Sequence, residues 1–157
     1  MKPTGAPLRS WDLFIEAFGQ HSANAKDVAA INDMAKKAAW RTPFDIHKRL
    51  IKDRQVIVVT DTDLNIVFAS NNIYAMTGYQ PQELIGETPR ILQGEETDAA
   101  IREDLRQAIS SKLPIKTDII NYRKNGVKYR CRIEAEPVFN RQGTHTHFIA
   151  FEEEVDL

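Results

Sequence analysis

The hydrophobic pattern of this chain changes its period near Asp53 and divides the sequence into two parts. Before this point, apolar residues recur at the spacing of amphipathic helices. After it, they alternate with polar residues in short runs typical of strands. We therefore expect a disordered tail over residues 1–9, a helical extension over 10–52 and one α+β domain over 53–157.

Three amphipathic helices are predicted in the extension. The first covers Trp11–Phe18 and stops at Gly19, the second covers Lys26–Trp40, and the third runs from a Thr42 cap to about Asp53. Their apolar stripes require a partner surface, which is either the sheet of the same chain or a second subunit.

Five antiparallel strands are predicted after Asp53, with short helices and one long helix, capped by Thr97, between the second and third. Their ranges are 55–60, 66–70, 115–123, 127–138 and 144–154. The first is apolar on both faces, so each face of the sheet needs a cover. Strand 127–138 is expected to have one core face, which includes Cys131, and one wet face. Such a sheet with helices on one face encloses a space where a small ligand commonly binds.

Composition argues against several classes of protein. A net charge of −1 gives no basic surface for nucleic acid or an anionic membrane. No apolar run approaches the length that spans a membrane, and without a signal peptide the chain is expected to stay in the cytoplasm. Cys131 has no base near it in sequence, and His145 and His147 have no evident third metal ligand, so we expect neither an enzyme nor a metal site.

Polar residues directed towards the predicted interior are the candidates for a binding site. Asn121 lies on the inner face of its strand, Gln93 follows an apolar pair, and Arg90 and Arg106 flank the same interior. Two guanidinium groups at a pocket mouth are suited to a phosphate. Structural hydrogen bonds and surface ion pairs explain the same residues equally well, and the residues alone do not decide.

Three motifs resemble the PAS domain superfamily, and within it the light-oxygen-voltage (LOV) branch of blue-light flavin photoreceptors. They are NNIYAMTGY at 71–79, GETPRILQG at 86–94 and NYRKNG at 121–126. The resemblance covers about residues 56–154. It implies a sensory module that is not an enzyme, a homodimer formed through flanking helices, and a downstream signalling protein as partner.

Some positions match the flavin-binding pattern of this branch and others depart from it. The resemblance places Arg90 and Arg106 near a flavin phosphate, and it matches Gln93 and Asn121 to flavin-binding amides. Pro89 stands where the family has its photoactive cysteine, so the usual bond between cysteine and flavin cannot form there. Two further family amides are replaced by Cys131 and Glu152, which we retain as pocket candidates.

Two functions remain open after this comparison of positions. The first is a stand-alone PAS-type sensory module that acts through protein contacts, with an unknown ligand or none. The second is a cysteine-less LOV-like flavoprotein, with FMN in the pocket, that senses blue light or redox state through flavin photoreduction. An ionised Glu152 would oppose a flavin carbonyl, whereas a protonated Glu152 would donate one hydrogen bond, and the sequence leaves this choice open.

Overall fold

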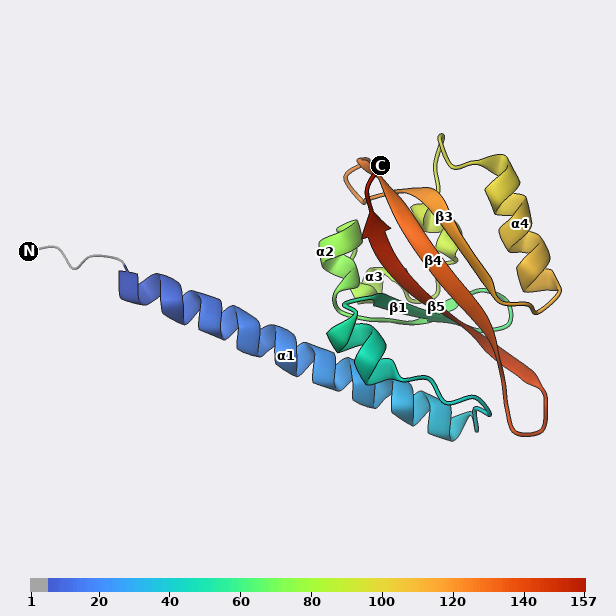
Figure 1. Ribbon diagram of the computed structural model, residues 1–157, viewed down its shortest axis with the longest axis horizontal. Coiled ribbons are helices and arrows are strands. Elements are labelled where there is room, and N and C mark those ends of the chain that lie inside the picture. The colour runs from blue at the N-terminus through green and yellow to red at the C-terminus, as the bar shows by residue number, and fades with distance from the viewer. Residues whose placement is uncertain (1–5) are drawn as a thin grey trace, which may run out of the picture.

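The structure, a computed structural model, describes the backbone of residues 6–157 and the side chains from Trp11 onwards. A long helix, α1 (Ala6–Lys37), leads through a π-helical turn, η1 (Lys48–Lys52), into the domain (Figure 1). The domain consists of β1 (Val56–Thr60), β2 (Ile66–Ala69), α2 (Ile73–Thr77), α3 (Pro81–Leu84), the 3-10 turn η2 (Pro89–Leu92), α4 (Ala99–Ser110), β3 (Ile115–Tyr122), β4 (Lys128–Phe139) and β5 (His145–Val155). Over this range, no helix combines the length and the apolar character needed to cross a membrane.

The five strands form one antiparallel sheet in the order β2-β1-β5-β4-β3. The last strand therefore lies beside the first, with Val56 opposite Glu152. Helices α2, α3 and α4 lie on one side of the sheet, and the second half of α1 lies on the other (Figure 1). The predicted α+β fold, a PAS-like five-stranded sheet preceded by a helical extension, is confirmed.

Side chains of β1 alternate between two cores, because successive residues of a strand point to opposite faces. Val56 and Val58 join the inner core with Ile73 of α2 and Leu84 of α3. On the outer face, the core contains Ile57 and Val59 together with Ile31 of α1, Trp40, and Leu50 of η1. The prediction that the helical extension covers the outer face of this sheet is thus correct within the same chain for the second half of α1 and for η1, whereas the first predicted helix, Trp11–Phe18, is exposed.

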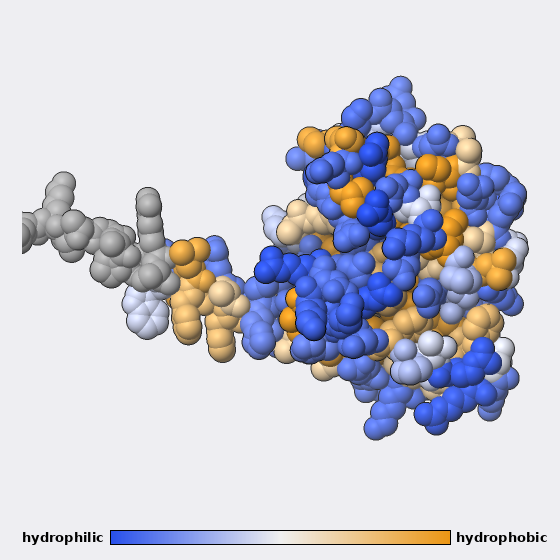
Figure 2. All heavy atoms as spheres, in the orientation of Figure 1, coloured by the Kyte–Doolittle hydropathy of each residue, from blue (hydrophilic) through white to orange (hydrophobic). Residues whose placement is uncertain are grey.

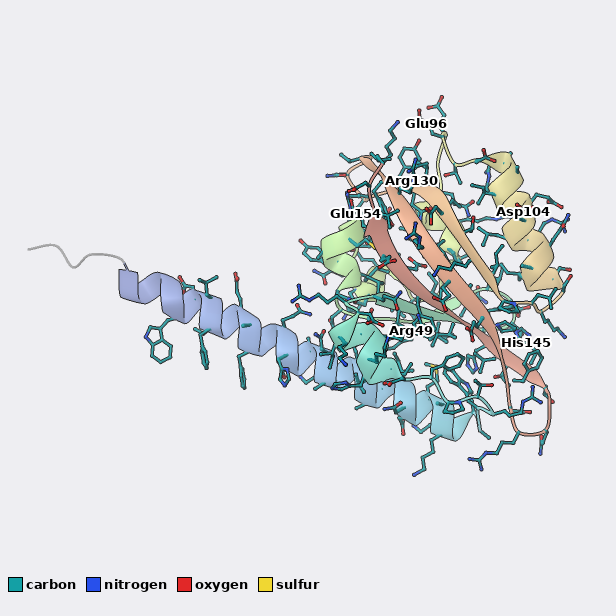
Figure 3. The ribbon with its side chains drawn as sticks, in the orientation of Figure 1. Arg49, Glu96, Asp104, Arg130, His145 and Glu154 are labelled. Atoms are coloured by element: carbon teal, nitrogen blue, oxygen red, sulfur yellow. The ribbon has the colours of Figure 1, made fainter. Side chains whose placement is uncertain are left out.

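The sequence predicts a solvent-exposed outer face along the whole of β4, but part of this face is buried. Val138 is fully buried against the outer core. Arg49 of η1 donates two hydrogen bonds to Glu134, at 3.1 and 2.9 Å, and its guanidinium lies 4.4 Å from the ring centroid of Phe151 (Figure 3). Because the guanidinium both pairs with a carboxylate and stacks on a ring, η1 is fixed to this face of the sheet.

The extension also differs from its prediction at Gly19. One continuous helix of 32 residues replaces the two predicted helices, and it begins at Ala6, inside the predicted tail. Gly19 does not stop it, since one glycine costs a helix interior only about 1 kcal/mol relative to alanine. The rest of the predicted tail, residues 1–5, lies outside the described residues.

Two predicted helix caps are displaced by a few residues. The third helix is the single turn around η1, and its first turn is capped by Asp45, whose Oδ1 accepts a hydrogen bond from the Lys48 amide, rather than by Thr42. Helix α4 is capped by Asp98, which accepts from two backbone amides, while the Thr97 hydroxyl donates to the Ile120 carbonyl of β3. Thr97 therefore joins the start of α4 to the sheet.

Candidate functional site

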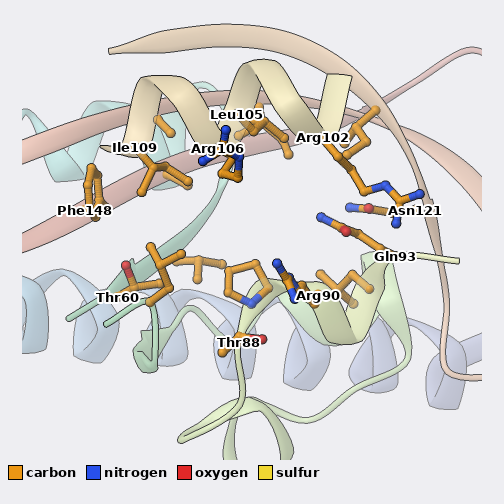
Figure 4. Close-up of a pocket in the computed structure, with 18 of the residues that line it drawn as sticks. Thr60, Thr88, Arg90, Gln93, Arg102, Leu105, Arg106, Ile109, Asn121 and Phe148 are labelled. Carbon is orange, nitrogen blue, oxygen red and sulfur yellow. The ribbon is translucent and has the colours of Figure 1, made fainter. Parts of the chain in front are cut away.

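A cavity of about 980 Å³ lies between the inner face of the sheet and helix α4 (Figure 4). Its apolar lining comes from four strands and from η2: Val58, Leu92, Ile119, Ile133, Phe148 and Ala150. Leu105 and Ile109 of α4 close the opposite side. A broad apolar lining with a few polar groups suits a flat ligand that is mainly aromatic.

Three arginines line the cavity from two sides. Arg90 extends from η2, and Arg102 and Arg106 extend from α4 across the space (Figure 4). Arg106 forms an ion pair with Glu103 at 2.5 Å, and this contact lowers the pKa of Glu103. Neither Arg90 nor Arg102 forms an ion pair with another described residue, so both guanidinium groups are available to an anion.

Arg102 is not among the site residues predicted from the sequence, although the sequence contains a signal for it. Arg102 lies four residues before Arg106, so the two side chains occupy the same face of α4. The same face carries the apolar residues Leu105 and Ile109, which also line the cavity. Two cations bordering an inward apolar stripe indicate the rim of a cavity.

Two amides lie close together at one end of the cavity, Asn121 from β3 and Gln93 from the segment after η2 (Figure 4). Asn121 is only 4% exposed and lines the cavity. A buried amide at a cavity wall offers both donors and an acceptor, so it suits a ligand with complementary groups. The structure thus brings together Arg90, Gln93, Arg106 and Asn121, as predicted.

The hydroxyl of Thr60 was not predicted to belong to the site. Thr60 closes β1 and lines the cavity, and its Oγ1 is buried without a hydrogen-bond partner among the described residues (Figure 4). The sequence shows only a threonine at the end of an apolar strand. Its inward direction follows from the alternation of β1, because Thr60 lies on the same face as Val56 and Val58 of the inner core, so the sequence did carry a signal for it.

Glu152 of β5 lines the cavity, but Cys131 of β4 does not. The Cys131 side chain is fully buried in the inner core, and its Sγ lies 3.7 Å from Oε2 of Glu152. Burial raises the pKa of the Cys131 thiol far above its usual range, so the residue remains a neutral thiol. The prediction that Cys131 contacts the pocket is therefore corrected: Cys131 supports Glu152 from behind the cavity wall.

Pro89, which stands where the resembling family has its photoactive cysteine, belongs to the same cavity. Pro89 begins η2, and both Thr88 and Pro89 line the cavity opposite α4. Among the described residues, no group of three or more side chains is arranged to hold a metal ion. His147 accepts a hydrogen bond from Trp40 instead, and His145 packs against Phe139 and Phe148.

Several known proteins are similar to this chain over the region that contains the cavity. Residues 54–155 match the family model of the PAS domain. The chain is 39% identical over 95 residues to a blue-light-activated histidine kinase of Brucella canis, covering 60% of this chain and 19% of the kinase. It is 30% identical over 123 residues to phototropin-1A of Oryza sativa subsp. japonica, covering 76% of this chain and 13% of the phototropin. The chain thus spans about a fifth or less of these two relatives.

Solved structures with the same fold include two light-oxygen-voltage domains. One, from work on a flavin analogue, superposes with a TM-score of 0.67 at 26% identity and covers 72% of this chain and 86% of its own. The dark structure of the Aureochrome1 LOV domain has a TM-score of 0.66 at 26% identity, and it covers 73% of this chain and 86% of its own.

Proposed function

This chain belongs to the PAS domain family, and from that premise we propose that it is a sensory module that binds FMN in the cavity beneath α4. One observation carries the proposal. A large apolar cavity contains a buried amide, Asn121, and a buried hydroxyl without a partner among the described residues, Thr60 Oγ1, while Arg90 and Arg102 line it without an ion pair to any described residue. The similarity to a blue-light-activated histidine kinase and to a light-oxygen-voltage domain described with a flavin analogue supports the same ligand.

The residues present fit a flavin in three respects. The apolar lining suits a flat ring system, and the amides of Asn121 and Gln93 offer the donors and acceptors that the polar edge of the ring requires. The guanidinium groups of Arg90 and Arg102 offer paired donors for phosphate oxygens. When bound, FMN supplies absorption of blue light and the capacity to accept electrons.

Pro89 and Cys131 limit the response of such a module. Pro89 has no thiol to form a bond with the ligand. Cys131 does not line the cavity, and the pKa of its thiol is raised by burial, so it does not replace the missing group. Under this proposal, the chain responds to blue light or redox state through a change in the oxidation state of the ligand.

The output is proposed to pass from the sheet to α1. Val58 of β1 lines the cavity, whereas its neighbour Val59 packs in the core beneath α1, so a shift of β1 reaches both sides of the sheet. The projecting half of α1 presents an apolar stripe, Trp11, Phe14, Ile15 and Phe18, whose side chains are each more than 60% exposed (Figure 2). A homodimer through this stripe, or a downstream signalling protein bound to it, would receive the signal.

The absorption spectrum of the purified chain tests the flavin proposal. We expect a blue-absorbing band after purification or after addition of FMN. Arg102→Ala should weaken FMN binding about tenfold, because a hydrogen bond to a charged group contributes about 1.5 kcal/mol or more. Arg141→Ala, at an exposed turn away from the cavity, is the matched control and should leave the affinity unchanged.

Light adds a second readout of the same proposal. Illumination of the loaded protein with a thiol reductant should bleach the blue band, and oxygen should restore it. A protein that remains colourless and binds no added FMN would contradict the proposal. It would favour the other reading, in which this PAS module acts through protein contacts with a different ligand or with none.

A further inference from the structure

Glu152 is the buried acid of the cavity. Asp63, Glu103 and Glu152 are the acidic side chains among the described lining residues, and of these only Glu152 is buried, at 7% exposure. On the neighbouring strands it is flanked by Val56 and Ile133, both apolar. Its hydrogen-bond partner is the Sγ of Cys131, at 3.7 Å. A thiol is a weak donor and gives a carboxylate little stabilisation.

Charged groups surround Glu152 without forming an ion pair with it. The other charged or titratable groups that line the cavity are Asp63, Arg90, Arg102, Glu103 and Arg106. Glu152 also borders a second hollow beside α1, together with His21, Asp53, Arg54, Tyr74, Glu153 and Glu154. Tyr129 of β4 is a further titratable group near Glu152, and its pKa is raised by burial and by the charged forms of Cys131 and Glu152. Arg123, at the end of β3, pairs with Glu154 at 2.5 Å. None of the ion pairs among the described residues includes Glu152.

A buried carboxylate without a cation is costly, so the fold favours the neutral acid at this position. Burial accordingly raises the pKa of Glu152 to about 7. A ligand that fills the cavity excludes the remaining water and favours the neutral form further. The neutral acid carries an O–H donor that the ionised form lacks.

We propose that Glu152 binds the ring of the cavity ligand as a neutral carboxylic acid that donates one hydrogen bond to a ring acceptor, so that ligand binding takes up a proton. The inference rests on the proposed function for the identity of the ligand as a flavin. Protonation of Glu152 therefore makes the affinity for the ligand depend on pH, whereas a glutamine at this position would offer the same donor at every pH. Of the two forms of Glu152 that the sequence left open, this proposal adopts the neutral one.

Titration with FMN at pH 6 and pH 8, followed by the quenching of flavin fluorescence, tests this proton linkage. Below pH 7, Glu152 of the ligand-free protein already carries the proton. Above pH 7, Glu152 must take up a proton when the ligand binds. The wild-type affinity should therefore fall about tenfold from pH 6 to pH 8 relative to Glu152→Gln. Taking the ratio of the two proteins at each pH removes the titration of the FMN phosphate. Glu153→Gln, next along β5 and partly exposed, should retain the wild-type dependence on pH.

Each outcome separates this inference from the function on which it rests. FMN binding with the same pH dependence in wild type and Glu152→Gln overturns the inference alone. Absence of FMN binding at both pH values in both proteins overturns the proposed function and the inference with it.

A second measurement does not depend on a folded variant. Wild-type protein mixed with riboflavin, which has no phosphate, should take up about one proton per site at pH 8 in weak buffer, as expected for a carboxyl that titrates near pH 7. Binding of riboflavin without proton uptake overturns the inference.

Discussion

The indole Nε1 of Trp40 donates a hydrogen bond to Nδ1 of His147, 3.2 Å away, and this contact joins the segment after α1 to strand β5. An indole N–H only donates, so Nδ1 carries the lone pair, and the proton of the neutral imidazole lies on Nε2. Protonation of Nδ1 would remove the acceptor. Burial lowers the pKa of His147, in agreement with a neutral ring in the folded protein.

Acid should therefore weaken the attachment of this segment to the sheet. Because the folded pKa of His147 lies below its unfolded value of about 6.5, its contribution to stability is complete above pH 6.5 and is lost as the pH falls through the folded pKa. The loss should be about 1 kcal/mol, close to one hydrogen bond. Urea unfolding at pH 7.5 and pH 5.5 measures it.

His147→Phe serves as the control for this pH effect. Burial also lowers the pKa of His145, so His145 adds to the loss of stability as the pH falls. The variant His145→Phe is therefore measured together with His147→Phe. Each variant should show a smaller decline in stability than wild type. An identical decline in wild type and His147→Phe would show that the contact with Trp40 is not the cause.

Asp27 attaches the middle of α1 to the domain. Its carboxylate is 6% exposed and accepts two hydrogen bonds from Asn71, from the backbone amide at 2.7 Å and from Nδ2 at 3.0 Å. Asp27→Ala should lower the free energy of unfolding by about 1–3 kcal/mol, since both donors lose their partner. Faster hydrogen exchange along α1 should accompany the loss.

Asp33 on the same helix is the matched control. Asp33 is exposed and pairs with Lys37 one turn later, so Asp33→Ala should change the stability by less than about 0.5 kcal/mol. Equal effects of the two substitutions would contradict a special role for Asp27.

These contacts mark the limit of prediction from the sequence. The change of period at Asp53 correctly predicted five strands, and the two-sided apolar pattern of β1 correctly predicted a second cover. The contact between Asp27 and Asn71 joins residues 44 positions apart, and no local pattern encodes it. The sequence predicts a stop at Gly19 because a glycine often ends a helix, but the neighbouring turns of α1 continue through it at a small cost.

The site was predictable where side chains alternate regularly along a strand. Asn121 followed from the alternation in β3, and its place in the cavity agrees with that prediction. Cys131 has the same kind of alternation in β4, yet it lies in the core behind the cavity. A period of two predicts which face of the sheet a residue lies on. It does not predict whether the residue lines the cavity or is buried in the core, because this depends on which helix covers each position.

Gly94 has to be a glycine because an aromatic ring lies close to its backbone. A Cβ on Gly94 would lie 2.5 Å from two ring atoms of Tyr122, whose hydroxyl accepts a hydrogen bond from the Glu96 amide. Gly94→Ala should therefore destabilise the protein by about 1–3 kcal/mol through overpacking. It should also weaken FMN binding, since Gly94 lines the cavity.

Gly19→Ala is the opposite case in the same chain. No atom lies within 4 Å of a Cβ built at Gly19, and the residue is within α1. This substitution should stabilise the protein by about 0.5–1 kcal/mol because alanine favours the helix. Thermal unfolding of both variants measures the two effects, and destabilisation by Gly19→Ala would contradict the continuous helix.

The projecting half of α1 should mediate self-association. An isolated helix of this length is marginally stable in water, and its aromatic stripe gains stability when a second copy covers it. The wild-type chain should be a dimer by light scattering. Phe14→Glu with Phe18→Glu should yield a folded monomer, because two buried aromatic contacts, each contributing about 1.5–3 kcal/mol, are replaced by charges. Leu13→Glu with Gln20→Glu adds the same charge to the opposite side of the helix and should remain a dimer. A monomeric wild-type chain, or a dimer that survives the paired phenylalanine substitutions, would show that the stripe serves a different partner.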